Sequence, residues 1–245
     1  MPRKLALAAG LILGATAAQA QDGWTREARL YMWFSGIQTT SDTKALGPVS
    51  TDVSADDVLS NLDFGLMAAV EGRKGPWTLA GDLIYSDLSH DADLSGPLGF
   101  SQSGIKTEMT ILSLYGLYRV SETLNFAIDM GVGLRGVDSK LTTSLVGSTR
   151  SSYSFESDAS WVDPLIAARI KVPFNDRWSG TLFADYGGTD SSDKTWQILA
   201  TVTYQINDRW GVQAGYRRMW LQHDLGNTPT TIVLDGPAIG ATFKF

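Results

Sequence analysis

The feature that most limits how this chain can fold is an alternation of apolar and polar residues, which runs through most of the sequence after residue 20. In the segment WQILATVTY, one face carries Trp196, Ile198, Ala200, Val202 and Tyr204. The other face is mostly Gln and Thr, and a period of two residues is typical of β-strands with one apolar side. No segment after Ala20 approaches the roughly 18 apolar residues that a transmembrane helix needs. If the chain enters a membrane, it must form a closed barrel, because only helices and closed sheets satisfy their backbone hydrogen bonds in hydrocarbon.

About ten such runs follow one another along the chain. Their approximate spans are 25–37, 62–73, 77–88, 104–119, 124–137, 161–172, 178–187, 194–205, 209–221 and 231–245. Short turns alternate with longer segments rich in Ser, Thr, Gly and Asp, near 38–61, 88–103, 138–160, 188–193 and 222–230. Short turns on one rim and long loops on the other are the layout of outer-membrane barrels. We therefore predict an all-β fold: one closed antiparallel transmembrane β-barrel of about ten strands over residues 21–245, with eight or twelve strands as alternatives.

The tetrapeptide NDRW occurs twice, at Asn175–Trp178 and at Asn207–Trp210, each time before an alternating run. Asn and Asp favour turns because their side chains hydrogen-bond to the nearby backbone. We interpret both copies as tight turns on one rim, each followed by a Trp that anchors the next strand in the headgroup layer.

One of the longer connections has a helical pattern of its own. Residues 54–62 predict a helical turn or two, with Ser54 as the cap and Asp57 three residues on. Two interpretations stay open: a lid over the barrel mouth, or a loop that folds against itself.

Three runs carry a Trp and a Tyr eight positions apart. Both rings of a pair point to the same face, roughly 26 Å apart along the strand, or roughly 20 Å along the axis of a barrel with strands tilted by about 40°. That distance approaches the height of the apolar band that aromatic girdles flank. The predicted membrane-interface aromatics are Trp77, Tyr85, Trp178, Tyr186, Trp196, Tyr204 and Trp210.

The first twenty residues have the three parts of an export signal. Arg3 and Lys4 are a positive start, an apolar run follows, and the small residues Ala18–Ala20 offer a cleavage site. We expect residues 1–20 to be removed after Sec-type export, which implies that the remaining chain lies in the envelope of a Gram-negative bacterium or is secreted.

The end of the chain, PAIGATFKF, also alternates and closes on an aromatic residue. It resembles the terminal strand of bacterial outer-membrane barrels, in which the final aromatic residue is recognised by the barrel-assembly machinery. With the signal, this likeness spans the whole chain, which is similar to the small outer-membrane β-barrel proteins of the porin-like superfamily, the group that holds the OmpA-type and OmpW-type barrels. The resemblance implies an assembly signal at Phe243 and Phe245 and a location in the outer membrane, in contact with its lipids and lipopolysaccharide.

Charged residues of both signs lie opposite the apolar face. Because seven acidic and seven basic residues are placed there by the alternation, we expect a lumen filled by cross-strand ion pairs rather than a wide selective pore. The predicted lumen charges are Glu27, Arg29, Glu71, Arg73, Asp82, Lys106, Glu108, Asp129, Arg135, Asp163, Arg169, Lys171, Asp185 and Arg217.

Composition narrows the classes of function. Acidic residues outnumber basic ones by 26 to 20, so nucleic acid is not an expected partner. The chain has two His and no Cys, so we expect no disulfide, no transition-metal site and no cofactor.

The sequence predicts no catalytic residue. Adjacent His–Asp and Asp–Asp pairs occur in the long connections, at Asp56-Asp57, His90-Asp91 and His223-Asp224, and a carboxylate can orient a His as a general base. Asp is common in these segments, and neither His is followed two positions later by the Ser expected of a lipid A deacylase. We therefore expect a non-catalytic barrel in envelope integrity or surface interaction. The alternatives are a narrow channel for small solutes and a barrel hydrolase, either omptin-like or lipid A-modifying.

Overall fold

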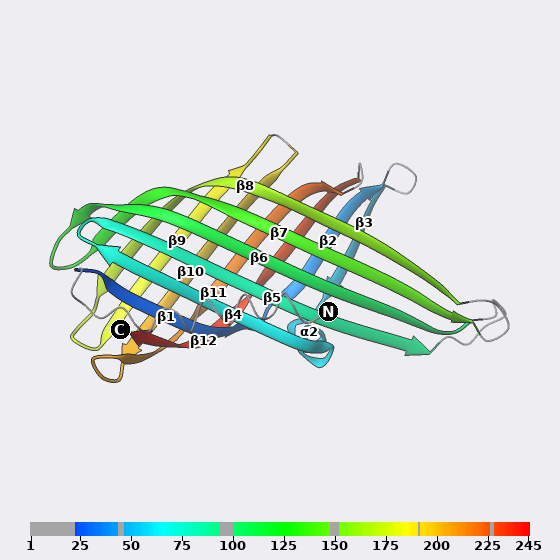
Figure 1. Cartoon of the computed structure of the whole chain (residues 1–245), viewed down its shortest axis with the longest axis horizontal. Coiled ribbons are helices and arrows are strands. Elements are labelled where there is room, and N and C mark those ends of the chain that lie inside the picture. Colours follow the sequence, from blue (N-terminus) through cyan, green and yellow to red (C-terminus); the bar gives the residue numbers. More distant parts are fainter. Residues whose placement is uncertain (1–22, 44–46, 94–99, 148–151, 191, 226–227) are drawn as a thin grey trace.

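The computed structural model describes residues 23–43, 47–93, 100–147, 152–190, 192–225 and 228–245. The predicted export signal lies outside these residues. The described chain is almost entirely β-strand and has one short helix, α2 (Ala55–Ser60) (Figure 1). Its strands are β1 (Thr25–Trp33), β2 (Gly36–Thr43), β3 (Gly47–Val53), β4 (Leu62–Lys74), β5 (Trp77–Asp93), β6 (Phe100–Glu122), β7 (Ala127–Gly147), β8 (Tyr153–Pro173), β9 (Trp178–Gly188), β10 (Lys194–Gln205), β11 (Trp210–Leu225) and β12 (Thr228–Lys244). No helix among the described residues is long and apolar enough to cross a membrane.

The strands form one antiparallel sheet that closes on itself. Neighbours follow chain order from β4 to β12, and β1 pairs with both β4 and β12 to complete the ring. The β2 strand continues along β12 in the register of β1, since Trp33 lies opposite Ala238 and Gly36 opposite Asp235. The β3 strand pairs with β2 as an outer hairpin. The fold is thus a closed ten-stranded barrel with two extra strands, which confirms the predicted fold class and strand number.

Short turns and both ends of the described chain lie at one rim, which we call the short-turn rim. Phe245 donates its backbone N–H to the carbonyl oxygen of Arg26 at 3.0 Å, so the two ends meet there. The two NDRW copies form the same turn. The Asn175 Oδ1 atom accepts from the backbone N–H groups of Arg177 and Trp178, both at 2.9 Å. In the second copy, Asn207 Oδ1 accepts in the same way from the backbone N–H groups of Arg209 and Trp210.

The opposite rim differs from the sequence prediction of loops. Segments near 38–61, 88–103 and 138–160 contain the β2–β3 hairpin and the outer halves of β5, β6, β7 and β8. Those four strands extend well past the rest of the barrel (Figure 1), with β6 reaching 23 residues. The ladder between β8 and β9 stops at Leu165, whereas that between β7 and β8 continues to Tyr153. We call residues 88–93, 100–110, 138–147 and 153–164 the outer sheet.

Helix α2 confirms the predicted helical turn. The Ser54 side chain accepts from the backbone N–H of Asp57 at 3.2 Å, as an N-cap does. None of the helix residues is buried, and Asn61 at its end accepts a backbone hydrogen bond from Ser89 of β5 at 2.9 Å. The segment is therefore tied to the barrel wall.

Candidate functional site

The inner face of the barrel carries two networks of paired charges. The first, which we call the rim network, lies nearest the short turns. Glu71 accepts from Arg29 at 2.9 Å, from Arg169 at 2.7 Å and from Lys171 at 3.0 Å. Arg29 also contacts Glu27 at 2.7 Å. One carboxylate thus joins three cations from strands β1 and β8.

The rim network continues across β7 and β6. Arg169 binds Asp129 through Nε at 2.8 Å and Nη2 at 2.6 Å, and Asp129 also accepts from Arg119. Arg119 contacts Glu122 at 2.8 Å, and Arg73 reaches the same carboxylate at 3.2 Å. The pairs alternate in sign along a chain of contacts, so neighbouring charges compensate one another in the barrel interior.

The second network, which we call the central network, crosses the lumen farther from the short turns. Arg217 donates to Asp82 at 2.6 Å, to the Tyr31 hydroxyl at 2.8 Å and to Gln197 Oε1 at 2.9 Å. Gln197 in turn donates to Asp185 at 2.5 Å.

Arg135 completes the central network from β7. It donates to Asp185 at 2.7 Å, to Thr195 at 2.5 Å and to Ser113 at 3.1 Å. The Tyr115 hydroxyl donates to the same Asp185 oxygen at 2.7 Å. The side chains of Arg135 and Asp185 are both fully buried, so the network binds strands from opposite sides of the barrel.

An apolar layer fills the lumen just beyond the central network, on the side of the outer sheet. Arg217 connects the two, because its guanidinium lies over the Trp33 ring at 5.0 Å. The layer consists of buried side chains from six strands: Trp33, Ile84, Met109, Ile111, Val137, Met219, Leu221, Ile232 and Leu234. The prediction of a lumen filled by cross-strand ion pairs was therefore incomplete.

Most of the predicted lumen charges do face inward. Glu27, Arg29, Glu71, Asp129, Arg169 and Lys171 lie in the rim network, and Asp82, Arg135, Asp185 and Arg217 in the central one. Asp163 is buried and accepts from the indole N–H of Trp161 at 3.1 Å. Arg73 lies partly exposed at the short-turn rim.

Lys106 and Glu108 were predicted inside, and that prediction is wrong. Both share the face of the exposed Leu112 and Leu114 on β6, and Lys106 contacts Asp87 on the outer wall at 3.0 Å. The reason is that β6 carries bulky apolar residues on both faces, so the alternation alone did not show which of its residues face the lumen. The same error hid Arg119, which has the inward phase of Ser113 and Tyr115.

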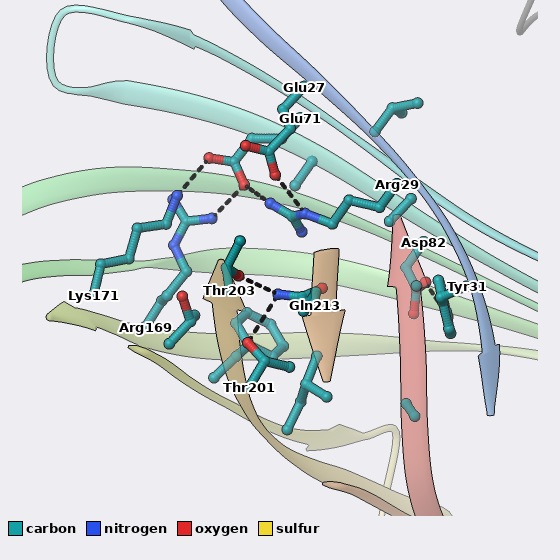
Figure 2. A pocket seen from close by; sticks show the side chains of 18 of the residues that line it. Glu27, Arg29, Tyr31, Glu71, Asp82, Arg169, Lys171, Thr201, Thr203 and Gln213 are labelled. Carbon is teal, nitrogen blue, oxygen red and sulfur yellow. Dashed lines mark hydrogen bonds and ion pairs between the residues drawn. The ribbon is translucent and has the colours of Figure 1, made fainter. Parts of the chain in front are cut away.

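A cavity of about 350 Å³ lies between the networks and the β9–β11 wall. It reaches the short-turn rim at Ser179, Gln205 and Lys244, and its deep end lies at Asp82 and Arg217. Figure 2 shows the charged residues of the rim network on one side of it, and Thr201, Thr203 and Gln213 on the other. Its lining includes none of the nine residues of the apolar layer.

The predicted interface aromatics lie on the outer wall in two groups. Near the short turns, Trp178 contacts Tyr204 with ring centroids 4.9 Å apart. At the other end of the same strands, Tyr186 lies opposite Trp196 in the ladder. Trp77 and Trp210 join the first group, and Tyr85 lies farther up β5. Of the predicted assembly signal, Phe243 packs against Trp210 at 4.7 Å and Phe245 against Phe243 at 5.9 Å.

One His lies near the outer mouth. The His223 ring is stacked on Trp161, with centroids 4.5 Å apart, and its Nδ1 atom lies 2.9 Å from Asp193 Oδ1 without the alignment of a hydrogen bond. In the same loop, backbone N–H groups of Ser192 and Asp193 donate to Asp190 and lower the pKa of its carboxyl. The side chains of His90 and Asp91 lie outside the described part of the chain.

No group of three or more His, Cys, Asp or Glu residues within the described ranges is arranged to hold a metal ion. His223 approaches Asp193 rather than the side chain of Asp224, whose backbone N–H donates to Asp193 at 3.4 Å.

No protein-family model matches this chain, and no curated protein matches it by sequence. Its fold is similar to that of the outer-membrane protease OmpT from Escherichia coli, with a TM-score of 0.55 and 10% identity over 94% of this chain and 100% of that one. The translocator domain of the autotransporter NalP from Neisseria meningitidis gives a TM-score of 0.45 and 12% identity over 99% of this chain and 95% of that domain. At these identities the likeness shows the fold alone. The chain has the fold of the small bacterial outer-membrane β-barrels.

Proposed function

We propose that this protein is a non-catalytic protein of the bacterial outer membrane. Its closed lumen makes the barrel a rigid support for the outer sheet. The outer wall supports the location: it exposes Leu30, Val70, Val132 and Ile166 between the two groups of aromatic residues, as lipid-facing strands do. Its expected contacts are membrane lipids and lipopolysaccharide. Phe243 and Phe245 at the end of β12 would be read by the barrel-assembly machinery.

The observation that carries this proposal is the filled lumen. The apolar layer draws side chains from six of the strands, and each of its nine members is at most 9% exposed. A layer packed to that degree leaves no room for hydrated solutes. The role that remains for the barrel is to hold the outer sheet at the cell surface, in envelope integrity or surface interaction.

The outer sheet suits that role. It carries partly exposed charges of both signs, among them Lys106, Glu108 and the paired Lys140 and Glu156. Beyond Leu165, the β8 strand has no β9 residue beside it. The sheet thus presents a polar surface with an open edge, which are features of surfaces that meet other molecules.

Conductance across planar bilayers tests the closed lumen. We expect no resolved current steps from the wild-type protein, since the apolar layer and the central network block the path. Insertion is verified in parallel by protection of the barrel from added protease, because a protein that failed to insert would also be silent. Stable open steps from inserted protein would contradict the proposal and favour the narrow channel for small solutes.

A barrel hydrolase is the second candidate, and one observation favours it. His223 lies beside Asp193 near the outer mouth, and a carboxylate next to a His is a common general-base arrangement. Incubation with a peptide library and with purified lipopolysaccharide tests it. Hydrolysis that His223→Ala abolishes would establish the enzyme and overturn the non-catalytic role.

A further inference from the structure

We propose that the cavity at the short-turn rim is a binding site for a small polyhydroxylated molecule with one negative charge, of the class of sugar acids. This site is separate from the surface role proposed above. It is a blind pocket, because its deep end is formed by Tyr31, Asp82 and Arg217 of the central network. In an outer-membrane barrel, the pocket would be reached from the periplasm.

One wall of the cavity offers neutral hydrogen-bonding groups. It is made by β9, β10 and β11 and carries the hydroxyls of Ser179, Thr181, Thr201 and Thr203 with the amide of Gln213. The Gln213 amide nitrogen donates to Thr201 at 2.9 Å and to Thr203 at 3.2 Å. These contacts fix the amide, and no other contact among the described residues uses its oxygen or the two hydroxyl protons. These side chains line the cavity (Figure 2), where the amide oxygen can accept from a polyol and the hydroxyls can donate to it.

The charged residues that line the cavity, from its mouth to its deep end, include more basic than acidic side chains. The lining includes five basic residues against three acidic ones, which are Arg29, Arg169, Lys171, Arg217 and Lys244 against Glu27, Glu71 and Asp82. Glu71 is shared by three cations. Arg29 also contacts Glu27 and Arg169 also contacts Asp129, so Lys171 is the cation that depends on the shared carboxylate alone. Lys171 on β8 and Lys244 on β12 stay accessible near the short-turn rim. An anion that enters the cavity is therefore favoured there.

The size and the apolar part of the lining fit one or two sugar rings. A cavity of about 350 Å³ lies at the small end of ligand pockets. Leu117, Phe183 and Leu199 line it beside the polar groups, and the Phe183 ring is held edge-on by Tyr115 at 5.1 Å. Apolar surface with a few oriented polar groups is the usual composition of a small-molecule site.

Calorimetric titration of the folded barrel in detergent micelles tests the proposal, with glucuronate, glucose and acetate as probes. We expect glucuronate to bind, glucose to bind about tenfold more weakly because it lacks the charge-assisted contact, and acetate to give no saturable heat. Thr203→Val and Lys244→Gln should each weaken glucuronate by about tenfold. Lys140→Gln, on the outer sheet far from the cavity, is the matched control and should bind as the wild type does.

Each other result overturns the assignment. If acetate bound as tightly as glucuronate, the cavity would be a simple anion site at the lysines. If glucose bound as tightly as glucuronate, the negative charge of the ligand would not contribute to recognition. No heat from any probe would leave the cavity a water-filled space. An equal loss in Lys140→Gln would show that the binding is not at the cavity. The altered mobility of unheated samples on gels verifies that every variant is folded. Binding in micelles is also independent of conductance, so this proposal can fail while the closed lumen stands.

Discussion

At the residue scale, the charges inside the barrel form cross-links between strands. Arg135 on β7 reaches Asp185 on β9, Thr195 on β10 and Ser113 on β6. A buried guanidinium is costly to desolvate unless acceptors surround it, and here several of its N–H groups have a partner. Such a pair makes the structure sensitive to the loss of either member.

Removing one member of this pair is expected to destabilise the barrel strongly. Asp185→Ala leaves the Arg135 guanidinium uncompensated, and should lower the free energy of unfolding by about 3–5 kcal/mol. Urea titration in lipid vesicles, followed by tryptophan fluorescence, measures the change. Replacing both members, Arg135→Met with Asp185→Leu, should recover most of the loss because no lone charge remains.

The exposed ion pair of the outer sheet supplies the control. Glu156 and Lys140 are paired with much of both side chains in water, where an ion pair contributes little. Glu156→Ala should therefore leave the unfolding midpoint within error of the wild type. An Asp185→Ala protein as stable as the Glu156→Ala protein would show that the buried pair does not cross-link the strands.

Alternation in the sequence was sufficient to identify most of these residues, and its failures have a physical cause. Asp129, Arg135 and Arg169 lie on strands in which one face is plainly apolar, so the sequence showed that these residues point inward. In β6, Ile111 and Leu117 face the interior while Leu112 and Leu114 face outward. Because an apolar layer lies inside the barrel, both faces of β6 carry apolar residues. Polarity therefore could not show whether Lys106, Glu108 and Arg119 point inward or outward. The cavity was not predictable either, because it depends on which side chains stop short of the barrel axis.

At the element scale, the two NDRW turns show how a short motif fixes the geometry of a hairpin. In each copy, the Asn side chain accepts two backbone N–H groups at the turn, and the preceding backbone pairs with the Trp that opens the next strand. Trp178 and Trp210 are thereby held on the outer wall at the same rim. The strands of the outer sheet are polar on both faces and carry no turn motif of this kind. Their Ser-rich and Thr-rich strands were therefore interpreted as loops.

The turn geometry predicts an asymmetric response to substitution within one motif. Asn175→Ala removes the acceptor of two backbone N–H groups and should cost about 1 kcal/mol of unfolding free energy. Asn175→Asp keeps the acceptor and should restore it. Asp176→Ala, next to it and exposed, should have little effect. Equal losses in the Asn175→Ala and Asp176→Ala proteins, measured by urea titration, would show that the chain reversal does not depend on this acceptor.

At the scale of the whole molecule, the barrel is layered along its axis. The rim network and the cavity lie near the short turns, the central network follows, and the apolar layer closes the lumen below the outer sheet. Each layer draws residues from strands far apart in the sequence, so the layers hold the ring closed in addition to the backbone ladder. With the closed lumen proposed above, this arrangement would let many charges lie inside a barrel without making a pore.

The location of the whole molecule predicts which exposed residues meet lipid. The chain has no Cys, so single nitroxide labels can be placed cleanly at Val132, Ile166 and Leu124, which are 64%, 65% and 95% exposed. Val132 and Ile166 lie on strands between the aromatic groups, and Leu124 lies in a short turn. In vesicles, labels at Val132 and Ile166 should collide with oxygen, which is concentrated in hydrocarbon, and be shielded from a water-soluble nickel chelate. The Leu124 label should show the reverse. If all three labels met the chelate equally, the apolar wall would be facing water, and a soluble protein with a different use for that surface would be the better account.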